Sequence, residues 1–248
     1  MSNLPDVTHP PTSVPPAPNT LSECTDIAVV FVVSLLAFLA EDTAIEHGWI
    51  PYGTEVRGAI AVLAGAAAAV AMVLARGGTL ADLGFRRPER WRIVPLQVLV
   101  ILIAFIGANF LAPLLVSAFI DVPAPDFSRY DSIAGNLGAA VMMALVLPFT
   151  ASIPEEIIYR GFLIGRLSCL FGEQTSGLVI AVILQALIFG TIHFQWGPGG
   201  MLVTLIMGLV WGIAYLWCGR NLWIVILAHS TGHMLFVVQL YLAESIII

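Results

Sequence analysis

The sequence predicts an all-α protein, a polytopic membrane helix bundle of about seven transmembrane helices. Of the 248 residues, 59% are hydrophobic and only 10% are charged, whereas a soluble protein usually carries about 25% charged residues. The mean hydropathy of the chain is +0.95. From residue 27 onward the chain is a succession of apolar runs, many near the roughly 20 residues that a helix needs to span a bilayer.

These runs give the expected helices in chain order. They cover residues 27–40 (extending toward 45), 56–75, 93–120, 133–166, 176–193, 201–218 and 222–242. The fourth and seventh runs are interrupted by polar residues, so that a break in one of them would raise the count to eight. No internal repeat relates the runs, which disfavours a transporter built from inverted repeats.

The first 26 residues differ from the rest of the chain. They are rich in proline and contain no lysine or arginine. A segment of this composition cannot bury a core, so residues 1–26 are expected to form a disordered cytoplasmic tail. Residues 27–248 are expected to form a single transmembrane domain. Because the tail lacks the basic stretch of a secretory signal, no cleavage is predicted.

Arginines predict the orientation in the membrane. All ten basic residues of the chain are arginines. Five of them crowd the segment between the second and third runs: Arg76, Arg86, Arg87, Arg90 and Arg92. Basic loops stay in the cytoplasm, so this loop and the N-terminus are expected there. The expected location is a bacterial plasma membrane, with membrane lipid as a partner and, since no basic block is present, no nucleic acid.

Two adjacent glutamates stand in the fourth run. Glu156 and Arg160 are four residues apart, so that they share one helix face and can form an ion pair. Glu155 points about 100° away from Glu156 on a regular helix and cannot share the arginine equally. An unpaired carboxylate is costly in a membrane and is usually functional. Glu155 is therefore predicted to act as a general base on water, with Glu156 and Arg160 in a supporting ion pair.

Three histidines lie within or at the ends of later apolar runs. His193 is near the end of the fifth run, and His229 and His233 are four apart in the seventh. A single such histidine is usually a hydrogen-bonded structural residue. Three of them with an intramembrane glutamate predict a functional cluster.

Glycines at a spacing of four predict close packing of helices. Gly161 and Gly165 form one such pair, and Gly208 and Gly212 form another. Small residues at this spacing let two membrane helices approach closely. These four glycines are therefore assigned to packing rather than to chemistry.

The ordered set of motifs resembles a known family. Glu155-Glu156-x-x-x-Arg160, Phe189-x-x-x-His193 and His229-x-x-x-His233 are similar to the three motifs of the CAAX prenyl endopeptidase and bacteriocin-processing family, also called CPBP or Abi. The resemblance covers residues 133–236, which form the expected catalytic core. It implies an intramembrane endopeptidase that acts on a membrane-associated or lipid-modified peptide or protein.

The resemblance also implies roles for these residues. Glu155 would activate a water molecule with the help of His193, while His229 and the residue four later, His233, would stabilise the oxyanion. Glu156, Arg160 and Phe189 would support the site. The family's third motif usually ends in asparagine, whereas this chain has His233.

Two alternatives remain open at this point. The first is a zinc-dependent version of the same protease, because His229 and His233 have the spacing of metal ligands and Glu155 and His193 could complete a site. A metal-free site without a cofactor is preferred. The second is a membrane transporter or a non-catalytic scaffold that keeps the motifs, since intramembrane ionisable residues also serve proton relays. The three cysteines are far apart and predict neither a disulfide framework nor a metal site.

Overall fold

The computed structural model describes residues 20–50 and 57–243. Over these residues the chain is helical and contains no strand, as the sequence predicts. The long elements are α1 (Thr20–Glu46), α2 (Ala59–Ala75), α3 (Val94–Phe119), α4 (Leu137–Leu147), α7 (Thr175–Thr191), α8 (Gly197–Trp217) and α9 (Leu222–Leu242). The connections contain the short 3₁₀ helices η2 (Leu80–Leu83), η3 (Trp91–Ile93), η4 (Ser128–Ile133) and η7 (Phe194–Trp196).

The fourth expected helix is one continuous rod with two widened stretches. After α4 come η5 (Pro148–Ser152), α5 (Ile153–Glu155), η6 (Glu156–Ile164) and α6 (Gly165–Phe171), of which η5 and η6 are π-helical. A proline has no N–H to donate to the carbonyl four residues earlier, and Pro148 and Pro154 stand at or beside the π stretches. Since π turns concentrate at functional positions in helices, this rod, residues 137–171, is where a site is expected.

Most expected boundaries agree with the structure, but one does not. The helix α1 begins at Thr20 rather than at residue 27, so residues 20–26 are helical and not part of a tail. Asp26 is fully buried there and forms an ion pair with Arg76 at 2.6 Å. This contact stabilises the helical conformation of residues 20–26. The predicted disorder of residues 1–19 lies outside the described residues. Neither the rod nor α9 is broken in two, so the described chain makes seven helical passes.

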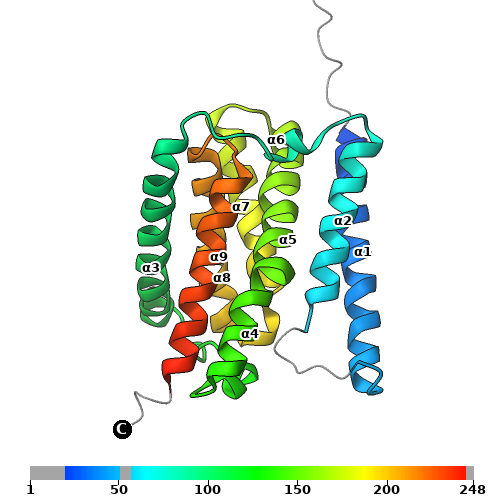
Figure 1. The fold of residues 1–248 in the computed structure, drawn as a ribbon. Helices are drawn as coiled ribbons and strands as arrows, with labels where there is room; N and C mark the ends of the chain where they lie inside the picture. The colour runs from blue at the N-terminus through cyan, green and yellow to red at the C-terminus, as the bar shows by residue number, and fades with distance from the viewer. Residues whose placement is uncertain (1–19, 51–56, 244–248) are drawn as a thin grey trace, which may run out of the picture.

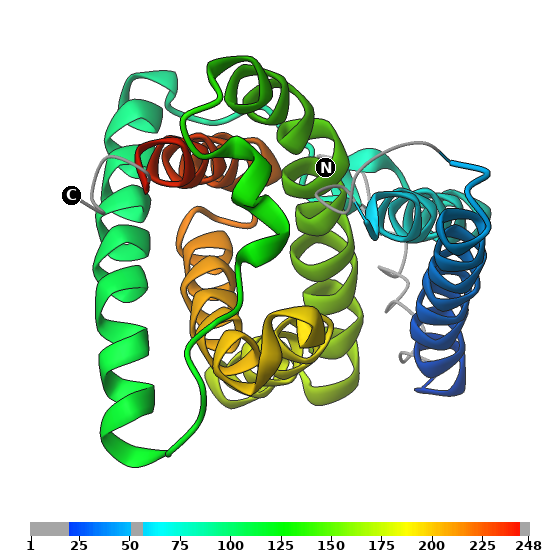
Figure 2. The same ribbon diagram turned by 90° about the horizontal axis from the view of Figure 1, so that it is seen from below.

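The passes form a bundle with a hairpin at one edge. Figures 1 and 2 show α1 and α2 side by side at one edge and α3 at the opposite edge, with the rod, α7, α8 and α9 between them. The helix α3 packs on α8 and α9, and α7 packs on α8. The start of α1, the loop between α2 and α3, and the loop between α8 and α9 lie at the same end of the bundle in Figure 1.

The helices are long and apolar enough to make this an integral, multi-pass membrane protein. Five helices of the described chain, counting residues 91–119, 137–171 and 194–217 as single units, meet the length and hydropathy of a membrane span. The helices α2 and α7 are apolar but shorter, with 17 residues each, or about 25 Å at 1.5 Å per residue. Large apolar side chains on the outer faces of these helices are exposed, as expected of surfaces that face lipid.

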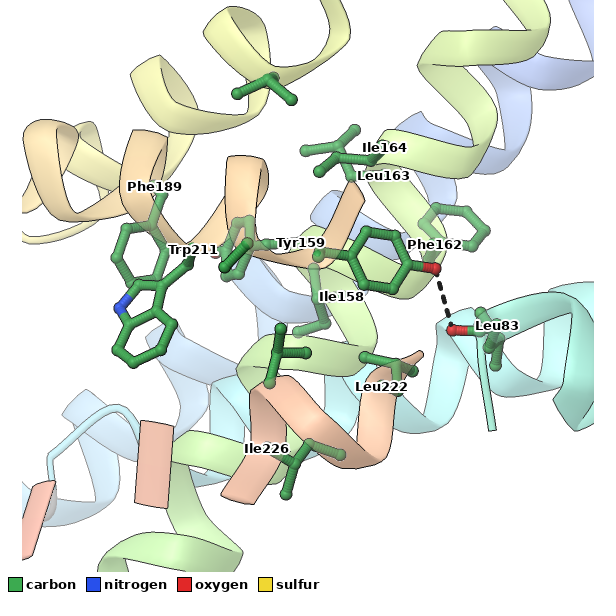
Figure 3. Packing of buried hydrophobic residues seen from close by; sticks show 14 of the residues in the cluster. Leu83, Ile158, Tyr159, Phe162, Leu163, Ile164, Phe189, Trp211, Leu222 and Ile226 are labelled. Atoms are coloured by element: carbon green, nitrogen blue, oxygen red, sulfur yellow. Dashed lines mark hydrogen bonds between the residues drawn. The ribbon is translucent and has the colours of Figure 1, made fainter. Parts of the chain in front are cut away.

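The core lies where the rod meets its neighbours. Phe162, Leu163 and Ile164 of the rod are buried together with Trp211 of α8 and Leu222 of α9, as Figure 3 shows. A Cβ added at Gly208 would lie 3.0 Å from the backbone of Ala186, so this glycine allows α7 and α8 to pack closely, as the sequence predicts.

Candidate active site

A buried ion pair occupies one side of the rod. Arg160 and Glu156 are both fully buried, and Arg160 Nη1 lies 3.2 Å from Glu156 Oε1, which confirms the predicted pair. The guanidinium of Arg160 also lies 4.6 Å from the ring centre of Phe189, a cation–π contact with α7. Phe189 therefore covers the charge of Arg160.

His229 binds the same carboxylate. Its Nδ1 lies 2.7 Å from Glu156 Oε1, and the ring stacks on Trp211 with 4.7 Å between centroids. Because Arg160 pairs with Glu156, this carboxylate is charged and can only accept, so His229 Nδ1 carries the hydrogen of that bond. In a neutral ring, Nε2 then has a lone pair and no proton.

Glu155 faces away from this pair into a cavity. Its side chain is buried, and its Oε2 lies 3.9 Å from His229 Nε2. No arginine of the described chain lies within ion-pair distance of it. The structure thus separates the two glutamates as the sequence predicts, with Glu156 paired to an arginine and Glu155 directed at open space.

His193 comes to the same cavity from the end of α7. Its Nδ1 lies 2.7 Å from the carbonyl oxygen of Phe189, one turn earlier. A carbonyl can only accept, so Nδ1 donates and Nε2 of the neutral ring has a lone pair. The ring is held between Phe189 and Trp196, at 4.8 and 4.7 Å between centroids.

His233 lies beside His229, with 4.4 Å between ring centroids. Its Nδ1 lies 2.8 Å from Oγ of Ser152, a residue of the rod. Ser152 is fully buried and lies three residues before Glu155. The four predicted site residues thus converge from three elements, although up to 78 positions separate them in the chain.

The cavity that joins them is large and mostly apolar. Its volume is about 960 Å³, near the upper end of the range of roughly 300–1,000 Å³ for ligand sites. Glu155, His193, His229 and His233 all line it. The other walls come largely from apolar side chains, which include Phe31, Leu35, Phe38, Val62, Phe105, Ile106, Met207 and Leu235.

The histidines and glutamates do not form a zinc site. Over the described residues, no group of three or more His, Cys, Asp or Glu side chains converges so as to hold a metal ion. The donor set of the zinc alternative, Glu155, His193, His229 and His233, does not fit a metal in this arrangement, and metal-free chemistry stays a prediction.

Sequence reasoning missed two residues of the site. Ser152 is a polar residue in an apolar run, three positions before Glu155 and hence near it on a helix, so a signal was available. Trp211, which stacks on His229, gives no such signal, because a tryptophan in a membrane helix usually packs against apolar neighbours.

The part of the chain that holds these residues is similar to a known protein family. Residues 137–235 match the family model described as type II CAAX prenyl endopeptidase Rce1-like. The match begins at the start of α4 and ends two residues after His233, so it includes all four predicted catalytic residues. No curated protein and no solved structure matches the chain.

Proposed function

We propose that the protein is an intramembrane endopeptidase that hydrolyses a peptide bond with water activated by Glu155. The match of residues 137–235 to the family model described as type II CAAX prenyl endopeptidase Rce1-like supports the endopeptidase activity. The observation that supports this best is the unequal setting of the two glutamates. Arg160 pairs with Glu156, while Glu155 faces the cavity beside an unprotonated nitrogen of His229. A free carboxylate next to hydrogen-bond acceptors is suited to bind and deprotonate water.

The reaction would proceed in two steps. Glu155 takes a proton from water as the water oxygen bonds to the carbonyl carbon of the substrate, and the carbonyl electron pair moves to oxygen. When this oxyanion collapses, the C–N bond breaks and the proton held by Glu155 passes to the leaving amine. A general base of this kind contributes roughly 10²–10⁴-fold in rate.

His193 and His229 are suited to hold the water. With both Nδ1 atoms donating to protein acceptors, the neutral rings offer lone pairs at Nε2 and can accept hydrogen bonds from water. This revises the expected role of His229, since a neutral ring that donates through Nδ1 to Glu156 cannot also donate from Nε2 to an oxyanion. Oxyanion stabilisation then falls to His233.

The walls of the cavity suit a substrate with an apolar part. Side chains from α1, α2, α3, α8 and α9 surround the polar residues, so a lipid-modified or membrane-inserted peptide can enter without losing favourable apolar contacts. We therefore expect the substrate to be a membrane-associated or lipid-modified protein rather than a soluble one.

The arginine-rich end of the bundle is proposed to face the cytoplasm. Arg76, Arg166 and Arg220 form ion pairs there with Asp26, Glu23 and Glu173, respectively. The loop from residue 76 to residue 93 adds four further arginines. This asymmetry supports a cytoplasmic N-terminus.

Cleavage by a matched pair of variants tests the function. Wild type and Glu155→Gln are reconstituted in nanodiscs with a quenched-fluorescence peptide that has a farnesylated cysteine near its C-terminus, and products are identified by mass spectrometry. Wild type should cleave the peptide and Glu155→Gln should lose roughly 10³-fold or more in rate. Glu173→Gln is the control and should keep wild-type activity, because it removes an exposed ion pair with Arg220 and neither residue lines the cavity.

Two outcomes would count against the proposal. Full activity of Glu155→Gln would remove the carboxylate from the mechanism. Ion flux through vesicles without any cleavage would favour the transporter alternative.

A further inference from the structure

Ser152 and His233 form an isolated neutral pair inside the site. Ser152 Oγ lies 2.8 Å from His233 Nδ1, and among the described residues this is the only hydrogen bond of that hydroxyl. Other hydroxyls in the bundle, such as those of Thr150 and Ser168, bond to carbonyls of their own helix. Ser152 instead directs its hydroxyl across to α9.

The direction of this hydrogen bond follows from satisfying both groups. If His233 Nδ1 donated to Ser152 Oγ, the hydroxyl hydrogen of a fully buried serine would have no acceptor among the described residues. An unsatisfied buried donor costs about 1–3 kcal/mol. If the hydroxyl donates to Nδ1, both groups are satisfied. The proton of the neutral ring then resides on Nε2.

This arrangement gives the cavity a hydrogen-bond donor. His233 lines the cavity, and Nε2 is the ring nitrogen that Ser152 leaves free. An Nε2–H group at this position resembles the N–H of an asparagine amide, the residue with which the resembled motif usually ends. A histidine with the proton on Nδ1 would offer a lone pair instead, which would repel an oxyanion.

We propose that Ser152 is a positioning residue that holds His233 in the Nε2–H form, so that His233 donates a hydrogen bond to the oxyanion. The inference rests on the proposed function for its catalytic consequence. The proton position itself does not depend on that function, so the two can be tested separately.

Nuclear magnetic resonance of the histidines tests the proton position. The full chain, labelled with ¹⁵N-histidine, is placed in nanodiscs, and long-range ¹H–¹⁵N correlations identify the protonated nitrogen of each ring. The signals of His233 are assigned by their loss in His233→Asn. We expect an Nε2–H ring in wild type and a mixture of the two forms in Ser152→Ala. An Nδ1–H ring in wild type, or a spectrum unchanged in Ser152→Ala, would overturn the inference.

A double-mutant cycle tests the catalytic consequence. Ser152→Ala should lower kcat for the farnesylated peptide about 10-fold with little change in KM, since loss of a whole oxyanion donor costs roughly 10²–10³-fold and the mixed ring keeps part of the donor population. In the His233→Asn background, which needs no tautomer control, adding Ser152→Ala should have no further effect.

The control is Ser168→Ala, a buried serine of the same rod whose hydroxyl bonds to the carbonyl of Gly165. It should keep wild-type kcat. Equal losses from Ser152→Ala in both backgrounds would show that Ser152 acts through packing and not through His233. If wild type cleaves no peptide while the spectra show the Nε2–H ring, the proposed function fails and the assignment of Ser152 stands.

Discussion

His229 and His233 are one turn apart on α9, yet the structure places them in opposite chemical settings. On the charged side of the site, His229 donates from Nδ1 to Glu156, which Arg160 also binds. On the neutral side, His233 receives at Nδ1 the hydroxyl of Ser152. The first ring is left with an acceptor at Nε2 and the second with a donor. The partners on the rod, and not the shared spacing on α9, decide what each histidine can do.

The two sides also differ in what their loss would do to the fold. Arg160 and Glu156 are fully buried charges, so that removing one leaves the other without compensation in a low-dielectric interior. Ser152 and His233 are neutral as a pair, and removing one leaves at most one unsatisfied polar group. The charged side is therefore expected to be both structural and functional, whereas the neutral side is expected to affect catalysis with little effect on stability.

The largest expected effect is that of Arg160→Met. It leaves Glu156 as an unpaired buried charge, which should lower the free energy of unfolding by about 3–5 kcal/mol and abolish cleavage. Denaturant unfolding in detergent measures the first and peptide turnover the second. The double variant Arg160→Met/Glu156→Met should regain much of the stability without regaining activity. Wild-type stability of the single variant would contradict the assignment of a structural ion pair.

Exchange of each histidine for asparagine compares the two sides directly. His229→Asn removes both the bond to Glu156 and the acceptor beside Glu155, and should lower kcat about 100-fold, the size of effect seen when one catalytic group is lost. His233→Asn keeps an N–H donor and should lower kcat by no more than about 10-fold, a small part of the effect of losing an oxyanion donor. Both are measured on the same farnesylated peptide. An equal decrease in kcat for both variants, or a larger decrease for His233→Asn, would contradict the distinction between the charged and the neutral side.

A smaller effect on stability is expected where Gly161 of the rod packs against the segment after α2. A Cβ at Gly161 would lie 2.6 Å from the carbonyl oxygen of Leu83, so Gly161→Ala should displace that loop and destabilise the protein by about 1–3 kcal/mol. A Cβ at Gly165 meets nothing within 4 Å, so the packing role predicted for this glycine is wrong. Gly165→Ala should therefore be neutral or slightly stabilising, because alanine favours a helix. Thermal unfolding of both variants checks the difference. A similar melting temperature for both variants would mean that the segment around Leu83 moves without a cost in stability.

The sequence predicted the parts of this account that depend on local pattern. Apolar runs located seven helical passes, and the spacing of four predicted the ion pair between Glu156 and Arg160. The motifs singled out Glu155, His193, His229 and His233, all of which line the cavity. These features follow from periodicity and from the cost of charge in a membrane. Both are visible in a single chain.

What the sequence did not predict depends on contacts between distant segments. Ser152 meets His233 across 81 positions, and the burial of Asp26 against Arg76, 50 positions away, extends α1 to Thr20. The π-helical turns around Glu155 also went unpredicted, although Pro148 and Pro154 mark them. The tautomers of the histidines follow only once their partners are known.

The most direct measurement of the central claim is a single turnover of the farnesylated peptide in water enriched in ¹⁸O. If Glu155 activates water, the new C-terminal carboxyl group should contain one ¹⁸O atom after the first turnover of wild type. A cleaved product without ¹⁸O would mean that its new oxygen came from the protein, with Glu155 as an attacking nucleophile, and would contradict the account.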